Sequence, residues 1–415
     1  MIVFVFPLIM GEHTTFIDWN RKDTLCPKTS AIYGQGDSMK VNYSIGSRVG
    51  IIIIFFIVCI AMTGTVEGSK PTQRSPIQIT TDPHYDRNPS VFQGKAGNYW
   101  LFFTRGNDDR GIRDYEGYNP DYDYYTVWYK TAKKLADLQN APEYKLPKDP
   151  PYSTAQRDVA ALQTNDGRIW VFTSPGYGPE DTSNNGIRAI HYYILDKYKT
   201  WTGPFSVLPG SYNGCGIGHI DVTENRGKLW LFYDECYRLK VTGYDPSIGI
   251  WSDPVLINPT ATLGKAIVAK GNFYVVWVYL NAEQGSWGPG IYLSTSRDGK
   301  TWLTGSEPVA AWGEGLTNWD PVIINDKNEF RILWAPSDTE QFIAMTSSAT
   351  PSDPSSWSSP LRVTSAASSG NYWWDFWPEA IKSGSKVALF YSSERSPDGT
   401  SRSDGNIWLI PSIPL

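Results

Sequence analysis

Four short segments of the sequence are versions of one another, and each contains a tryptophan near its start. The tryptophans Trp201, Trp251, Trp302 and Trp357 lie 50, 51 and 55 positions apart. A repeat of roughly 40–55 residues built from strands and turns is typical of a β-propeller, in which each repeat forms one four-stranded blade. We therefore predict an all-β propeller whose blades each contribute a loop to one central mouth, where we expect the function to lie.

Length, composition and charge fit such a repeat protein. The chain has 415 residues, more than the roughly 250–300 residues that usually share one core, but repeat proteins grow by adding repeats. Its 18 Trp and 25 Tyr supply flat side chains for packing between blades, and those left over suit stacking against sugar rings. The net charge is −5 and the sequence contains no run of five or six like charges, so we expect no nucleic-acid partner. We expect a monomer.

An apolar segment in the N-terminal part of the chain predicts export. Val49–Thr63 is apolar almost throughout, and Lys40 and Arg48 precede it. A basic region, an apolar stretch and small residues after it are the pattern of a signal peptide, while a spanning helix needs roughly 20 residues; an uncleaved membrane anchor stays open. We expect residues 1–73 to be a leader with a short linker, residues 74–415 to be the propeller, and the protein to be extracellular or at the cell surface.

Two cysteines lie outside the leader. Cys215 and Cys236 flank a predicted hairpin of residues 218–234, and the midpoint between them coincides with its turn at Asn225–Gly227. The two thiols therefore face each other across the open end of the hairpin. Because exported proteins keep disulfides, we predict a Cys215–Cys236 disulfide; two free buried thiols are the alternative.

Six pairs of predicted strands, each joined by a turn rich in Gly, Asn and Asp, follow the leader and predict six blades. The segment Arg74–Thr80 resembles the predicted outer strand Ser359–Thr364, so we expect it to pair with the last repeat and close the ring, which removes two exposed sheet edges. The predicted pairs are Asn88–Gln93 with Tyr99–Thr104, Asp158–Gln163 with Ile169–Thr173, Ile220–Glu224 with Leu229–Tyr233, Lys265–Ala269 with Phe273–Val278, Asp320–Ile324 with Phe330–Trp334, and Glu379–Lys382 with Val387–Tyr391.

The first repeat contains a long insertion, Asn107–Tyr125, which is rich in Tyr and Asp. We expect this loop to overhang the mouth. The sequence contains no metal motif of recognised spacing and we expect no cofactor, although an Asp-rich loop of this kind is one place for a calcium ion.

The segment Ser296–Trp302 resembles the Asp-box of sialidases and related six-bladed propellers. In that family the box shapes the turn between the third and fourth strands of a blade, on the face away from the active site, so its residues are structural. Asp245–Trp251 and Asp353–Trp357 are degenerate versions of it. The resemblance covers roughly residues 74–410.

A second resemblance to sialidases lies at the opposite face of the first blade. Arg87-Asn88-Pro89 looks like the Arg-x-Pro motif that opens the first sialidase blade, and Arg105 like its second-strand arginine. The resemblance implies that Arg87 holds a substrate carboxylate, that Arg105 helps to position it, and that Asp108 or Asp109 in the following loop is the acid/base.

The chain departs from this family in the later blades. Sialidases carry further arginines there and a Tyr–Glu nucleophile pair; here the inner-strand positions of the fourth and fifth blades are Lys265 and Asp320, and the sequence indicates no such pair.

The first blade also resembles that of five-bladed arabinanases and β-xylosidases, on the evidence of residues 88–103. In that group an Asp general base precedes the Pro, and the residue here is Asn88. Asp158 and Asp221 fall near the positions of that group's pKa-tuning Asp and acid Glu. The six predicted repeats favour six blades over five.

Inner strands of a propeller begin at the functional face, and several of these starts carry carboxylates among Arg, Lys and Trp. Glycoside hydrolysis needs two carboxyl groups across the bond, one protonated and one ionised. His219 is expected to be a hydrogen-bonding strand residue. The candidate catalytic residues are Asp158, Asp221, Glu379 and Asp109, and the candidate substrate-binding residues are Arg87, Arg105, Arg157, Asp320, Trp319 and Trp377.

Two functions stay open at this point. The first is an exported glycoside hydrolase with a sialidase-like propeller that cleaves a glycan with its mouth carboxylates. The second is a non-catalytic surface propeller that binds glycans or another protein, with a charged, solvated channel.

The disulfide is directly testable. We expect titration of the exported domain with a thiol reagent, under denaturing and non-reducing conditions, to detect no free thiol. Two titratable thiols would show that Cys215 and Cys236 are reduced, and titration after reduction is the positive control.

Overall fold

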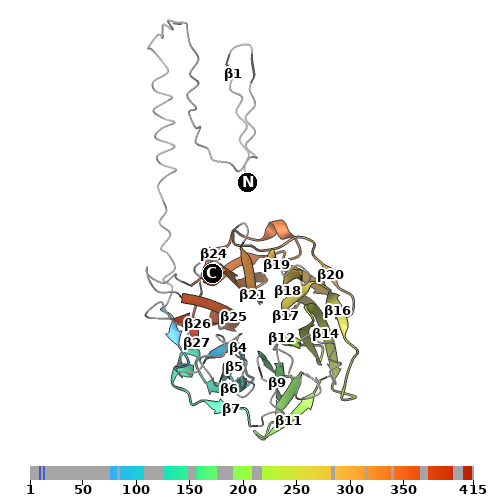
Figure 1. Cartoon of the computed structure of the whole chain (residues 1–415), viewed down its shortest axis with the longest axis vertical. Coiled ribbons are helices and arrows are strands. Elements are labelled where there is room, and N and C mark those ends of the chain that lie inside the picture. The colour runs from blue at the N-terminus through green and yellow to red at the C-terminus, as the bar shows by residue number, and fades with distance from the viewer. Residues whose placement is uncertain are drawn as a thin grey trace, which may run out of the picture. The chain divides into compact units, whose positions relative to one another are not determined.

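Six β-sheets form a ring in the computed structural model (Figure 1). The structure describes residues 9–10, 13–14, 75–81, 85–106, 125–147, 156, 158–174, 190–207, 217–281, 286–313, 316–337, 341–364, 373–395 and 405–413. The first strand of each sheet packs beside the first strand of the next sheet, and that of the last sheet beside that of the first. The predicted six-bladed propeller is therefore confirmed.

Each blade is an antiparallel sheet whose first strand lies innermost. Blade 1 contains β4 (Asp86–Gln93), β5 (Tyr99–Gly106), β6 (Tyr125–Ala132) and β7 (Tyr144–Lys145), and blade 2 contains β8 (Asp158–Gln163), β9 (Ile169–Ser174), β10 (His191–Leu195) and β11 (Trp201–Ser206). Blade 3 contains β12 (Ile217–Asn225), β13 (Lys228–Glu235), β14 (Arg238–Asp245), β15 (Ile250–Trp251) and β16 (Val255–Asn258), and blade 4 contains β17 (Ala261–Ala269), β18 (Asn272–Asn281), β19 (Ser286–Ser296) and β20 (Leu303–Thr304). Blade 5 contains β21 (Thr317–Asp326), β22 (Glu329–Ser337), β23 (Ala344–Ser348) and β24 (Leu361–Arg362), and blade 6 contains β25 (Trp373–Ser383), β26 (Lys386–Arg395), β27 (Gly405–Ile410) and β3 (Ile77–Gln78). The remaining elements are β1 (Ile9–Met10), β2 (His13–Thr14) and the 3-10 helices η1 (Leu135–Asn140) and η3 (Pro354–Ser356).

All six predicted strand pairs occur as antiparallel pairs, but most inner strands begin earlier than predicted. In five of the six, the pairing register with the second strand shifts near the mouth, as at a β-bulge. One residue at each shift has a positive φ, between 46° and 57°. A bulge leaves one residue out of the ladder and redirects its side chain. The five residues are Asn88, His219, Leu263, Asp320 and Trp377.

The repeated tryptophans pack at the joints between blades. Trp201 of blade 2 meets Phe102 of blade 1 edge-on, with ring centroids 6.5 Å apart. An edge-to-face contact of this kind adds about 0.5–1.5 kcal/mol to the burial of the rings. The same geometry recurs between Trp251 and Phe172 and between Trp302 and Phe232, at 5.8 and 6.0 Å. The number of residues between successive tryptophans is therefore the number of residues between successive joints.

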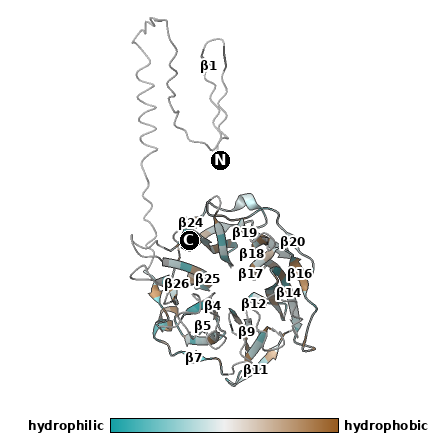
Figure 2. Ribbon diagram, in the orientation of Figure 1, coloured by the Kyte–Doolittle hydropathy of each residue, from teal (hydrophilic) through white to brown (hydrophobic). Residues whose placement is uncertain are grey.

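The hydrophobic core is divided among the joints. Six clusters of buried side chains each combine residues of neighbouring blades. Figure 2 accordingly shows hydrophobic stretches in blades all round the ring. Because no blade buries its faces alone, stability depends on contacts between neighbours, as in other repeat proteins.

Turns on the side away from the mouth are shaped by aspartates. At the β19–β20 turn, Asp298 Oδ1 accepts hydrogen bonds from the N–H groups of Lys300 and Thr301, both at 2.8 Å. The indole N–H of Trp302 donates to Gly299 O at 3.2 Å. The turn thus fixes the tryptophan that enters the joint.

The N-terminal strand β3 supplies the fourth strand of the sixth blade, where Ile77 lies opposite Leu409 and Gln78 opposite Trp408. The Thr80 hydroxyl accepts a hydrogen bond from the N–H of Ile407 at 2.9 Å. On the other side, Lys130 of blade 1 donates from Nζ to Ile79 O at 2.9 Å. The segment 75–81 therefore contacts both the last blade and the first.

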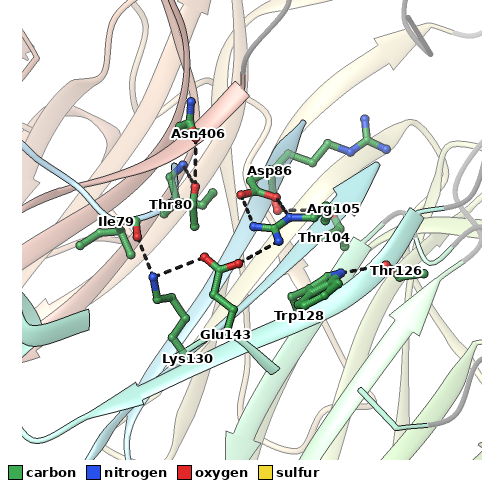
Figure 3. A network of polar contacts seen from close by, with 12 residues as sticks. Ile79, Thr80, Asp86, Thr104, Arg105, Thr126, Trp128, Lys130, Glu143 and Asn406 are labelled. Carbon is green, nitrogen blue, oxygen red and sulfur yellow. Dashed lines mark hydrogen bonds and ion pairs between the residues drawn. The ribbon is translucent and has the colours of Figure 1, made fainter. Parts of the chain in front are cut away.

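A buried polar network accompanies this seam (Figure 3). Arg105 contacts both oxygens of Asp86, at 2.6 and 2.8 Å, and also Glu143 at 2.8 Å, while Lys130 reaches Glu143 at 3.4 Å. The positive charges of Arg105 and Lys130 are thus matched by the two carboxylates of Asp86 and Glu143. Burial raises the pKa of Asp86 to about 6 although Arg105 opposes it. Burial alone would lower the pKa of Arg105, but Asp86 and Glu143 outweigh it and raise that pKa.

The propeller lies within one compact unit of the chain, residues 71–415. The apolar segment Val49–Thr63 and the insertion 107–124 lie outside the described residues, so export and the overhanging loop stay predictions. Among the helices that the structure describes, none is both long and apolar enough to span a membrane.

We expect Arg105→Ala to lower the free energy of unfolding by about 3–5 kcal/mol, because it leaves the buried Asp86 without its partner. The matched control is Arg168→Ala. The Arg168 side chain is 38% exposed and pairs with the exposed Asp166, so its loss should cost about 0–1 kcal/mol. Urea unfolding of the two variants measures the difference, and equal costs would contradict a structural role for the network.

Candidate functional site

A cavity of about 440 Å³, counted with its open mouth, lies at the starts of the inner strands. Each of the six inner strands contributes the same two consecutive positions to its wall. The first position is the bulge residue in five blades and the first residue of β8 in the other. The pairs are Asn88-Pro89, Asp158-Val159, His219-Ile220, Leu263-Gly264, Asp320-Pro321 and Trp377-Pro378, with Lys265 in addition.

Asp158, from blade 2, is held by neighbours on both sides. Asn88 Nδ2 donates to Asp158 Oδ1 at 2.7 Å, and the Ser174 hydroxyl and the His219 N–H donate to Oδ2 at 2.8 and 2.9 Å. Burial by itself would raise the pKa of Asp158. The charges of His219 and Arg87, with these hydrogen bonds, outweigh burial and lower the pKa below its ordinary value, so this carboxyl is ionised.

His219, from blade 3, lies between two carboxylates. Its Nδ1 is 3.0 Å from Asp234 Oδ2, and its own N–H binds Asp158. Burial would lower the pKa of His219, but the charge and hydrogen bond of Asp234, with Asp158 and Asp320, raise it to about 9. The imidazole is therefore a cation at neutral pH, and its side chain is 28% exposed.

Asp320, from blade 5, has the opposite character to Asp158. Blades 2 and 5 stand opposite each other in a ring of six, so the two carboxyl groups lie on opposite walls. Burial raises the pKa of Asp320 to about 6, although His219 and a hydrogen bond from the N–H of Trp377 oppose this. The site therefore holds one carboxylate that is ionised and one carboxyl that is protonated in mildly acidic solution.

Three inner strands carry a second layer of charged side chains, each two residues beyond the bulge residue of its strand. Lys265 Nζ lies 4.0 Å from Asp221 Oδ1 and 3.7 Å from Glu379 Oε2. Lys265 belongs to blade 4, Asp221 to the neighbouring blade 3 and Glu379 to blade 6, so the contact with Glu379 reaches across the channel. Burial raises the pKa of Asp221 and that of Glu379, the latter to about 7. Burial would lower the pKa of Lys265, but the two carboxylates raise it.

The bulges explain why carboxylates gather here. A bulge takes a backbone N–H out of the ladder, and a buried N–H needs an acceptor. Carboxylates of the preceding blade meet this need three times: Asp158 binds the N–H of His219, Asp234 that of Leu263, and Asp320 that of Trp377.

The two arginines of the first blade are placed differently. The guanidinium of Arg87 lies 3.9 Å from the ring centroid of Tyr125 and 5.0 Å from that of Trp377. Arg105 lies opposite Asp86 in the ladder and is bound by Asp86 and Glu143. It does not line the cavity, and a role in substrate binding is not supported by these contacts.

The other predicted site residues have mixed placements. Trp377 lines the cavity, and Trp319 packs against Trp287 at 4.0 Å between centroids. Asp109, Arg157 and Cys215 lie outside the described residues, so their roles, and the disulfide, stay predictions. In the part of the chain that the structure describes, no cluster of His, Cys, Asp or Glu is arranged to hold a metal ion.

Sequence reasoning missed Asp234. The predicted second strand, Leu229–Tyr233, ends one residue before Asp234, whereas β13 continues to Glu235. Glu235 pairs with Lys240, and adjacent strand residues point to opposite faces. Sequence reasoning also left the Tyr–Glu pair unplaced. Tyr85 donates to Glu394 at 2.5 Å, but both are buried and neither lines the cavity. Burial first, and then the charge of Glu394, raise the pKa of Tyr85 far above its usual range.

No family model and no curated protein matches the sequence. Solved structures do resemble the chain. A protein of unknown function from Dyadobacter fermentans has a TM-score of 0.61 at 14% identity, covering 81% of this chain and 97% of that one. An α-L-arabinanase of Penicillium chrysogenum, solved with arabinobiose, has a TM-score of 0.56 at 14% identity, covering 82% and 98%.

A Trypanosoma rangeli sialidase, solved with the inhibitor DANA, has a TM-score of 0.53 at 8% identity, covering 81% of this chain and 57% of the sialidase. At such identities the likeness shows the fold alone. The predicted resemblance to sialidase and arabinanase propellers is confirmed at that level.

We expect Lys265→Met to destabilise the protein more at pH 8 than at pH 5. Without the ammonium, Asp221 and Glu379 bind protons more tightly in the folded state than in the unfolded chain, so the free energy of unfolding falls as the pH rises. The loss at pH 8 should be about 3 kcal/mol, the lower end of the range for broken buried pairs. Lys228→Met, in an exposed pair with Asp245, is the control, and an equal loss at both pH values would contradict the ion pairs.

Proposed function

We propose that the protein is an exported, carbohydrate-active propeller that hydrolyses a glycosidic bond in the central cavity. The observation that carries this proposal is the pair Asp158 and Asp320. Their environments drive their pKa values in opposite directions, and they belong to opposite blades of one cavity. Two carboxyl groups in different protonation states across a bond are what this hydrolysis requires.

In this mechanism Asp320 is the general acid and Asp158 the ionised partner. Asp320 donates its proton to the oxygen of the leaving group as the bond breaks and positive charge develops on the sugar ring. Asp158, fixed by Asn88 and Ser174, either activates a water molecule on the opposite face of the sugar or attacks the ring directly. The separation of the two carboxyl groups in the substrate complex distinguishes these routes, at about 6.5–9.5 Å for the first and about 5–5.5 Å for the second.

Glu379 is a weaker candidate for the acid. Its pKa of about 7 is suitable, but its carboxyl group is committed to Lys265, and it is not part of the cavity wall. Asp221 is committed in the same way, to Lys265 and to the N–H of Ala266 at 2.6 Å. We therefore assign both to the support of the site.

The wall also carries a surface suited to a sugar. Trp377 lines the cavity together with Asp320, and the guanidinium of Arg87 lies 5.0 Å from the centroid of its indole ring. Aromatic faces suit the C–H groups of sugar rings. The similarity in fold to an arabinanase and a sialidase supports a glycan as ligand, without identifying the sugar or the linkage.

The alternative is a propeller that binds glycans without cleaving them. One observation favours it: the guanidinium of Arg87 lies near the rings of Tyr125 and Trp377, and its buried Nε has no hydrogen-bond partner among the described residues. This arrangement suits the recognition of an acidic group on a ligand and requires no chemistry.

We expect the protein to release reducing ends from at least one member of a glycan panel, with activity that falls as the pH rises through about 6 because Asp320 loses its proton. Asp320→Asn and Asp158→Asn should each reduce the rate by about 10²–10⁴-fold. Asp253→Asn, at an exposed position, should leave it unchanged. Glycan binding without release from any substrate would favour the binding protein instead.

A further inference from the structure

We propose that Asp234 holds the imidazole ring of His219 as a positioning group for the acid–base pair, so that this ring is the cation beside Asp158 in the cavity. The consequence for catalysis rests on the proposed function. The contacts that hold the His219 ring do not depend on that function.

The surroundings of Asp234 make its carboxylate a hydrogen-bond acceptor for this ring. It is fully buried, and its Oδ2 accepts from the Leu263 N–H at 3.2 Å and from the Thr262 hydroxyl, as well as facing His219 Nδ1 at 3.0 Å. An ionised carboxylate can only accept hydrogen bonds, so Nδ1 must carry a hydrogen. Asp234 thereby keeps Nδ1 protonated and fixes how the ring is turned.

The backbone fixes the other end of the histidine. His219 is a bulge residue with φ 47°, and its N–H is bound to Asp158 Oδ2. The bonds from Thr262 and Leu263 tie Asp234 to blade 4. The ring is therefore held by blades 2, 3 and 4 together.

The charges around the ring favour the imidazolium form. Asp158 of β8, Asp234 of β13 and Asp320 of β21 influence the ring electrostatically. Lys265 of β17 lines the same cavity and opposes them, but it is already engaged by Asp221 and Glu379. The resulting cation acts on both members of the acid–base pair, because it favours the ionised form of Asp158 and limits the rise of the Asp320 pKa.

Histidine NMR tests this placement without any substrate. The chain contains four histidines, so full-length protein labelled with ¹⁵N-histidine gives few ring signals, and His219→Gln identifies the signal of His219. We expect both ring nitrogens of His219 to be protonated at pH 7, with a titration midpoint about 9. Asp234→Asn should move the midpoint toward the ordinary histidine value near ~6.5, and Asp253→Asn should not move it.

The wild-type spectrum alone decides the case if Asp234→Asn does not fold. A neutral His219 ring at pH 7, or a midpoint unchanged by Asp234→Asn, would overturn the proposal. Neither outcome depends on the enzyme assay, so failure here is distinguishable from failure of the proposed function.

The pH profile of hydrolysis tests the consequence for catalysis. Removing the imidazolium by His219→Gln should raise the pKa values of both Asp158 and Asp320, so both limbs of the profile should shift to higher pH. A lower rate with unshifted limbs would mean that His219 only supports the fold, and would overturn its positioning role.

Discussion

The bulge near the mouth end of the inner strands is the constraint on which the site depends. Each holds a non-glycine residue at positive φ, a conformation that costs about 1–3 kcal/mol and persists only where the surrounding structure imposes it. The burial of apolar side chains at the six joints between blades offsets this strain and fixes the blades on both sides. Each bulge brings one residue to the cavity wall, and at three of the five bulges a carboxylate of the preceding blade binds the N–H that the bulge frees. Strain, side-chain placement and the gathering of carboxylates thus have a common origin.

The electrostatics of the cavity follow from neutralisation in layers. At the first layer the imidazolium of His219 pairs with Asp234 and its charge also favours the ionised form of Asp158. At the second layer Lys265 lies near Asp221 and Glu379. At Asp320, burial raises the pKa although His219, the N–H of Trp377 and Lys265 oppose it. At Asp158, the charges of His219 and Arg87 and the hydrogen bonds to the carboxylate outweigh burial. The different protonation of the two carboxyl groups therefore follows from how strongly nearby charges and hydrogen bonds oppose burial at each.

Much of the fold was predictable from the sequence, because the signals were local. Tryptophans at the joints repeat once per blade, and Gly, Asn and Asp mark the hairpin turns, so the count of six blades was correct. The mouth ends of the strands were not predictable to the same degree. Pro89, Pro321, Pro378 and Gly264 interrupt the alternating pattern where the bulges lie, so the predicted strands began late. The sequence indicates substrate binding for Asp320 and does not indicate the acid role proposed for it, since its relation to Asp158 depends on two blades that face each other. The contact of Arg105 with Glu143 was not predictable either, since Glu143 lies 38 positions further along the chain.

The pairing of β3 with β27 has a consequence for how the molecule is assembled. Leu409 lies opposite Ile77, so the sixth sheet joins nearly the first and nearly the last residues of the propeller. A chain made from its N-terminus must keep the 77–78 strand unpaired until every other blade has been synthesised, and contacts so distant in sequence form slowly. A long waiting strand would be a template for aggregation, but this one is only two residues long, and short edges recruit other chains poorly. The brevity of β3 thus protects the nascent protein during the interval before its ends meet.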